Sequence, residues 1–180
     1  MKKLILLLIA FASISAQEIQ FGVNLSTKFA STEKTITGYG FWGDPRIRKE
    51  GGNFTGYSFS VDLTADFNKY IAIISELGYT GSGDEYDGID AGLYYSTNKL
   101  HDFVYLKSGF YVHINIPENP RANSRTIFIS SLGAGIRILK HLYIEGAYQI
   151  PITKSYVKED AIQLHSEVNK IYYIGMKIVY

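Results

Sequence analysis

The stretch that decides the fold is residues 57–67, which read YSFSVDLTADF. Apolar and polar side chains alternate along it, with Tyr57 and Phe59 on one side and Ser58 and Ser60 on the other. Successive side chains of a β-strand point to opposite faces of the sheet, whereas those of a helix share a face every three or four residues. The alternation therefore predicts a strand with one apolar face and one polar face.

The same alternation recurs along the rest of the chain and predicts a series of strands. Their predicted bounds are Ile19–Phe29, Phe54–Phe67, Tyr70–Thr80, Ile89–Thr97, Phe103–Ile114, Thr126–Ile138, His141–Ile150 and Asn169–Tyr180. Beyond residue 16, no segment has a sustained helical period or the apolar run of about 20 residues that a membrane helix needs. The predicted fold class is all-β.

The connections between these strands alternate in length. Short ones lie at residues 68–69, 98–101 and around 140, and longer ones at residues 30–53, 81–88, 115–125 and 151–168. Short turns on one rim and long loops on the other are typical of transmembrane β-barrels. The pattern therefore predicts a closed eight-stranded antiparallel transmembrane barrel, with both ends of the barrel domain at the rim of the short turns.

The polar face of the predicted strands consists mostly of Gly, Ser, Asn and Tyr, with isolated charges of both signs. Its acids are Asp62, Asp66, Glu76, Asp90 and Glu145, and its bases are Lys28, Lys107, Arg137 and Lys177. A Lys or Arg facing the middle of a bilayer costs about 2–4 kcal/mol, so these charges belong inside the barrel and the apolar face meets lipid. Because buried charges need partners, we expect an interior ion-pair network. Its predicted members are Asp62, Glu76, Lys107, Arg137, Glu145 and Lys177.

The N-terminal segment has the pattern of a secretory signal peptide. Lys2 and Lys3 precede the apolar run Leu4–Ile14, and the small pair Ser15-Ala16 follows it. The predicted division is a signal peptide at residues 1–16 and a barrel domain at residues 17–180. The whole chain carries 18 basic and 17 acidic residues, so no basic excess indicates nucleic acid, and without cysteine it has no disulfides.

The C-terminal stretch, residues 172–180, reads YYIGMKIVY and resembles the C-terminal signal of bacterial outer-membrane barrels. The resemblance implies that the barrel-insertion machinery reads the terminal aromatic, here Tyr180 in place of the commoner Phe. Residues 21–26 (FGVNLS), 76–79 (ELGY) and 132–136 (LGAGI) resemble the PorT-like outer-membrane barrels of Bacteroidetes. That resemblance implies a barrel in the outer membrane and no particular reaction.

Two of the long loops contain candidate binding residues. Tyr39, Phe41 and Trp42 form an aromatic group that predicts either a binding surface or contact with the rim and the lipid headgroups. Residues 81–88 are acidic and glycine-rich, but they lack the spacing of a calcium loop, which favours a solvated loop without metal. In the last loop, residues 159–168 space their apolar side chains like one face of a short helix.

No arrangement in the sequence has the spacing of a catalytic triad. His113 falls near the outer rim, where parity directs it inward, away from any lipid substrate. We therefore predict no catalytic residue, no metal and no cofactor. The predicted role is a non-enzymatic scaffold or accessory subunit of an outer-membrane complex. Its predicted partners are membrane lipids, lipopolysaccharide and possible neighbouring outer-membrane proteins.

Two alternatives remain open at this stage. The first is a lipid-A-modifying enzyme, either a hydrolase or an acyltransferase, which needs a histidine, serine and acid gathered at the outer rim. The second is a soluble periplasmic barrel that encloses an apolar ligand, which needs a wide apolar cavity.

Overall fold

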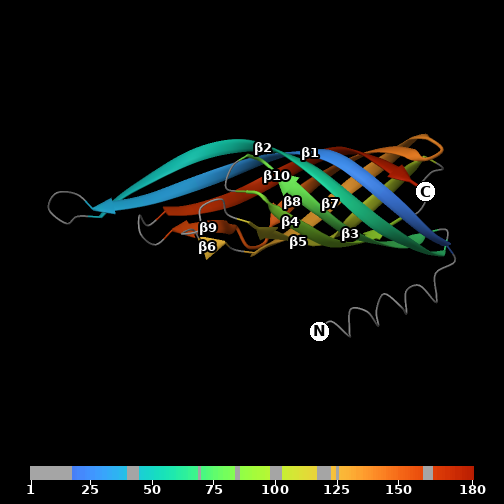
Figure 1. Ribbon diagram of the computed structural model, residues 1–180, viewed down its shortest axis with the longest axis horizontal. Coiled ribbons are helices and arrows are strands. Elements are labelled where there is room, and N and C mark those ends of the chain that lie inside the picture. Colours follow the sequence, from blue (N-terminus) through green and yellow to red (C-terminus); the bar gives the residue numbers. More distant parts are fainter. Residues whose placement is uncertain are drawn as a thin grey trace, which may run out of the picture.

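The computed structural model consists of β-strands joined by turns and loops (Figure 1). It describes residues 18–39, 45–68, 70–83, 86–97, 103–116, 123–124, 126–159 and 164–180. The strands are β1 (Glu18–Tyr39), β2 (Pro45–Asn68), β3 (Ile71–Gly81), β4 (Gly88–Ser96), β5 (Val104–Asn115), β6 (Asn123–Ser124), β7 (Thr126–Leu139), β8 (Leu142–Pro151), β9 (Ser155–Glu159) and β10 (Leu164–Val179). Within those ranges, no helix has the length and apolarity needed to cross a membrane. The predicted signal peptide, residues 1–16, lies outside the described residues.

Eight of the strands form a closed ring in the order β1-β2-β3-β4-β5-β7-β8-β10. Every neighbouring pair is antiparallel, and β10 returns to pair with β1, from Gly22↔Val179 to Ile36↔Leu164. Closure matters because an unpaired strand edge in hydrocarbon leaves backbone groups without hydrogen bonds. The predicted all-β barrel of eight antiparallel strands is confirmed.

Five strands of the ring agree closely with the sequence predictions. Strands β3, β4, β5, β7 and β8 begin and end within one residue of the bounds that the alternation predicts. The agreement arises because each of these strands alternates over most of its length and is flanked by turn-forming residues in the sequence.

The predicted loop at residues 30–53 is wrong, because β1 and β2 continue through most of it. They pair residue by residue as far as Tyr39↔Pro45, and they project beyond the other strands (Figure 1). The segment contains Thr32, Thr35 and Ile36, β-branched residues that favour extended backbone. We name residues 30–39 and 45–56 the β1–β2 extension.

The predicted short helix at residues 159–168 is also wrong where the structure describes it. Leu164 begins β10, and β10 pairs there with both β9 and β1. Backbone pairing on two sides overrides the local helical spacing, which by itself is a weak determinant of structure. Strand β6 pairs with β9. The projecting parts of β2, β1 and β10 together with β9 and β6 thus form a small outer sheet, in that order.

Apolar side chains cover the outside of the ring, as predicted from the register. Leu25, Phe59, Phe110, Leu132 and Met176 are all more than half exposed. The polar face points inward, where glycines make room for larger side chains. A Cβ at Gly135, for example, would overlap the ring of Tyr105 on the neighbouring strand. The molecule therefore has an apolar exterior around a polar interior, the reverse of a soluble protein.

Candidate functional site

The first interior ion pair joins β2 to β10 across β1. Nζ of Lys177 lies 2.9 Å from Oδ1 of Asp62, and both side chains are buried. Gly22 of β1 lies directly opposite Asp62, and Lys177 lies opposite Asn24, two residues further along β1. The missing side chain of Gly22 leaves the space that the carboxylate occupies.

The second group of interior charges is centred on Glu145, which is completely buried. Nζ of Lys107 lies 2.6 Å from Oε2 of Glu145 and 4.0 Å from Oε2 of Glu76. The Tyr173 hydroxyl donates to Glu145 at 2.8 Å, and the Tyr105 hydroxyl and the Asn24 amide also donate to it. A buried carboxylate with this many donors is compensated for the water it has lost.

The third group is centred on Asp90, nearer the rim of the long loops. Nζ of Lys28 lies 2.6 Å from Asp90 Oδ2, and Nδ1 of His113 lies 2.8 Å from Oδ1. The Thr80 hydroxyl donates to the same carboxylate at 2.5 Å and shares a 2.6 Å hydrogen bond with the Ser58 hydroxyl. Parity directs Lys28, Asp90 and His113 inward, but alternation along the sequence does not show that they meet. Asp90 and His113 lie opposite each other on the adjacent strands β4 and β5, and aligning these two strands in the sequence could have predicted their contact.

An apolar layer closes the interior beyond His113. Its members are Ala30, Phe54, Tyr86, Ile127, Ile129, Val168 and Ile171. The ring of Tyr86, from the β3–β4 connection, stacks on His113 with 3.9 Å between centroids and lies 4.8 Å from the ring of Phe54. This layer was not predicted from the sequence. The run Ile127-Phe128-Ile129, apolar on both faces, is the signal that could have indicated it.

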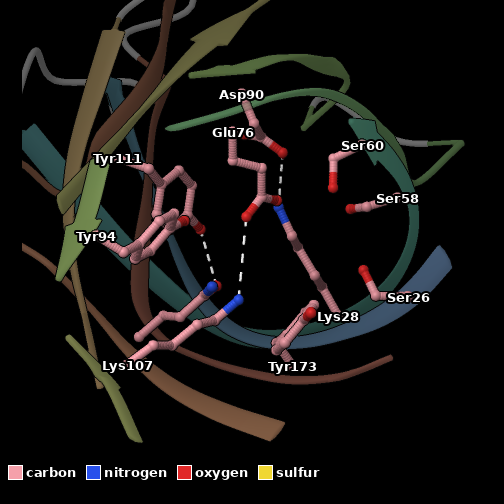
Figure 2. A pocket seen from close by; sticks show the side chains of 11 residues that line it. Ser26, Lys28, Ser58, Ser60, Glu76, Asp90, Tyr94, Lys107, Tyr111 and Tyr173 are labelled. Carbon is pink, nitrogen blue, oxygen red and sulfur yellow. Dashed lines mark hydrogen bonds and ion pairs between the residues drawn. The ribbon is translucent and has the colours of Figure 1, made fainter. Parts of the chain in front are cut away.

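Between the second and third groups lies a small cavity (Figure 2). Glu76, Lys28 and Lys107 point toward one another there, and the rings of Tyr94 and Tyr111 form one wall. The cavity has room for about one water molecule. Most of the side chains that line this cavity are buried, so side chains fill the barrel interior at this level.

Five of the six predicted network residues lie in these interior groups: Asp62, Glu76, Lys107, Glu145 and Lys177. The prediction for Arg137 is wrong, because its side chain is exposed and makes no ion pair with another described residue. It lies near the end of β7, where the register shifts before Leu139. A long basic side chain at a rim can extend into water and needs no buried partner.

The predicted loop sites are described only in part. Tyr39 ends β1, while Phe41 and Trp42 lie outside the described residues. In the acidic stretch 81–88, Asp87 accepts hydrogen bonds from the backbone N–H and the hydroxyl of Ser82, at 2.6 and 2.9 Å. No group of three or more His, Asp or Glu side chains in the described ranges is placed to hold a metal.

Tyr180 lies just past β10, and its side chain is exposed. Its backbone N–H donates to the carbonyl of Phe21 at 2.8 Å, and the Phe21 N–H donates back to Tyr180 at 3.1 Å. The terminal residue thus contributes backbone bonds to the seam between the first and last strands of the ring.

The charged side chains of Glu33, Arg48, Lys49 and Glu50 on the β1–β2 extension are exposed to solvent. Nζ of Lys49 donates to Oε1 of Glu33 at 2.7 Å, and Nε of Arg48 lies 2.6 Å from Oε1 of Glu50. The hydrogen bond to Glu33 and the charge of Glu33 raise the pKa of Lys49 above its ordinary value.

No protein-family model matches this sequence, and no curated protein matches it. Solved structures do match. OprG from Pseudomonas aeruginosa, an outer membrane protein, has a TM-score of 0.52 and 11% identity, with 89% of this chain and 95% of that chain covered. Ail, the attachment invasion locus protein of Yersinia pestis, has a TM-score of 0.42 and 14% identity, over 88% and 98%. The outer membrane protease OmpT from Escherichia coli has a TM-score of 0.44 and 10% identity, over 92% and 98%.

At these identities the likeness concerns the fold alone. The match to OprG spans nearly all of both chains, and it agrees with the closed ring, the apolar exterior and the polar interior described above. These observations together support an outer-membrane location. The chain has the fold of a bacterial outer-membrane β-barrel.

Proposed function

We propose that this protein is a non-enzymatic scaffold of the bacterial outer membrane, presenting its β1–β2 extension and long loops outside the cell. One observation carries the proposal: an apolar belt surrounds a barrel whose polar interior is filled and closed toward the long loops. A filled barrel offers no path for solutes, so the surfaces left for function lie beyond the rims.

The proposal includes several parts inferred from the sequence. Export requires removal of residues 1–16 as a signal peptide. The C-terminal strand with Tyr180 addresses the barrel-insertion machinery, and the apolar belt contacts outer-membrane lipids and lipopolysaccharide. The proposal includes a role as an accessory subunit beside other outer-membrane proteins, which the surfaces beyond the rims would contact.

The geometry around His113 favours a non-catalytic role over a lipid-A-modifying enzyme. The imidazole is completely buried, bonded to Asp90 and covered by the ring of Tyr86. A lipid acyl chain outside the barrel has no access to a group enclosed in this way. The soluble alternative is disfavoured because it would expose the whole apolar belt to water.

The test is fractionation of cells that produce the full chain, followed by purification in mild detergent. We expect the mature protein in the outer membrane, with gel mobility that changes on heating and with one or more protein partners co-purifying. A variant in which residues 37–47 are replaced by a two-residue turn should still fold, because β1 pairs with β10 only as far as Ile36, but it should lose those partners. A control variant, Lys140→Gly, alters the β7–β8 turn at the opposite rim and should keep the partners. Recovery from the soluble periplasm, or partners unaffected by removal of the extension, would contradict the proposal.

A further inference from the structure

The outer edge of β2 has no neighbouring strand over Pro45–Gly56 in the part of the chain that the structure describes. β2 pairs with β1 along its whole length, but its pairing with β3 begins only at Tyr57, opposite Gly81. Alternate backbone N–H and C=O groups along that edge therefore lack a strand partner. Such an edge is a template for the addition of another strand.

The other side of the β1–β2 extension is already occupied. β1 pairs with β10 as far as Ile36, β10 pairs with β9, and β9 pairs with β6, which has only 2 residues. The small outer sheet therefore has one very short edge at β6 and one long edge at β2. A strand that joins this sheet has a long backbone partner only at β2.

Space around this edge is open on both faces of the extension. Ile47 is 66% exposed, and the side chain of Arg48 is 77% exposed. A Cβ at Gly51 would meet nothing within 4 Å. An added strand therefore has an open approach along residues 46–53, whereas Phe54, nearer β3, is buried against Tyr86.

The charge of the segment indicates which kind of strand it accepts. Pro45–Gly56 contains the bases Arg46, Arg48 and Lys49 and the single acid Glu50. A second copy of this chain would bring the same basic surplus to the edge, and basic side chains on an edge strand oppose pairing between copies. An acidic strand would instead approach a complementary surface.

We propose that the open edge of β2 binds an extended, acidic polypeptide segment of another protein, which pairs with β2 as an additional strand. This inference rests on the proposed scaffold function and names the chemistry of its partner. Backbone hydrogen bonds to Pro45–Gly56 supply affinity, and the basic side chains select acidic sequences.

The test uses the purified full chain in detergent micelles and a fluorescent ten-residue peptide of alternating Glu and Thr or Val. Two control peptides match it in length: one has Lys in place of Glu, and the other has every backbone nitrogen methylated, so that it keeps its charge but cannot pair as a strand. Inorganic polyphosphate serves as an anion without a peptide backbone. We expect the acidic peptide to bind, the Lys peptide to bind at least about tenfold more weakly, and the methylated peptide not to bind.

Two variants locate the site. Arg46→Ser with Arg48→Ser should weaken binding of the acidic peptide, whereas Arg137→Ser with Lys140→Ser makes the same change in net charge at the opposite rim and should not. Bound peptide should slow backbone hydrogen exchange in residues 46–56 and leave the short-turn rim unchanged.

Three results would overturn the inference. Equal binding of the methylated peptide or of polyphosphate would reduce it to general anion attraction. Binding without slowed exchange in residues 46–56 would move the site elsewhere. A dimer with these amides already protected would identify a second copy as the occupant. These outcomes are separate from failure of the scaffold proposal, which is decided by cell fractionation and co-purification.

Discussion

Gly22 lies directly opposite Asp62 in the β1–β2 pairing, and a side chain at residue 22 would overlap the Asp62 carboxylate. The same carboxylate forms a 2.9 Å ion pair with Lys177, from the strand on the other side of β1. A single missing Cβ thus provides the space through which an ion pair crosses a strand. This relationship makes the packing of the barrel interior open to direct test.

Gly22→Ala should lower the free energy of unfolding by about 1–3 kcal/mol, because the new methyl group displaces the Asp62 carboxylate in a filled interior. Urea titration of the protein in detergent, followed by tryptophan or tyrosine fluorescence, measures the change. Gly38→Ala is the matched control, since a Cβ there meets nothing within 4 Å. Equal changes in the two variants would show that the Asp62 carboxylate can move away from a methyl group at residue 22 without loss of stability.

Lys107→Met should lower the free energy of unfolding by about 3–5 kcal/mol, because it leaves Glu145 charged and buried without its cation. Adding Glu145→Gln to this variant should recover part of the loss, since the double variant no longer buries an unpaired charge. Arg137→Met, at an exposed position, should change stability by less than about 0.5 kcal/mol. Additive effects of the two interior substitutions in urea unfolding would argue against direct coupling of the pair.

Tyr86→Ala should lower the free energy of unfolding by roughly 3 kcal/mol, because it removes the ring that stacks on His113 and contacts Phe54. Tyr86→Phe keeps the ring and should retain most of the stability. In planar bilayers, the unaltered protein should show no steady conductance, since Lys28, Lys107 and Tyr111 are buried at one level of the interior and the cavity between them has room for about one water molecule. A stable open channel would refute the filled interior.

The Lys49 ammonium should titrate above pH 10.5, its ordinary value, because its hydrogen bond to Glu33 favours the charged form. Since the pKa is raised in the folded protein, the stabilisation is present below about pH 10.5 and is lost as the pH rises through the folded value. Glu33→Gln should return the pKa of Lys49 toward 10.5, and Glu18→Gln, at the opposite rim, should leave it unchanged. NMR titration of the lysine side chain gives both values, and an unchanged pKa in the Glu33 variant would exclude this hydrogen bond in solution.

Deletion of Tyr180 should separate assembly from stability. The deletion removes two backbone bonds to Phe21 and one exposed aromatic, which together should lower stability by about 1–3 kcal/mol. Loss of the terminal aromatic that the insertion machinery is inferred to read should lower the amount of folded barrel in cells far more. Quantitative blotting of membranes and refolding in detergent measure the two effects. Normal assembly in cells would show that Tyr180 is not an assembly signal. Failure to refold in detergent would show that Tyr180 contributes more to the stability of the barrel than expected here.

Alternation along the chain was sufficient to identify the strands of the ring and the face that each turns to lipid. A strand exposes successive side chains on opposite sides, so the pattern in residues 57–67 reports burial directly. The limits of β1 and β2 could not be predicted in the same way. Beyond the membrane both faces of a strand can meet water, so polar residues such as Lys34 and Thr35 continue a strand without marking it as one.

Local sequence by itself therefore determined the fold class, the lipid-facing side of each strand and the inward direction of most charges, because these depend on a two-residue period. The tertiary structure alone decided which charges meet. Lys28 pairs with Asp90, 62 residues away, and Lys107 with Glu145, 38 residues away. It also decided that Arg137 lies at a rim and that, among the described strands, none pairs with the outer edge of β2 before Tyr57. Strand length, register and closure bring distant residues to one level of the barrel, and no local period contains that information.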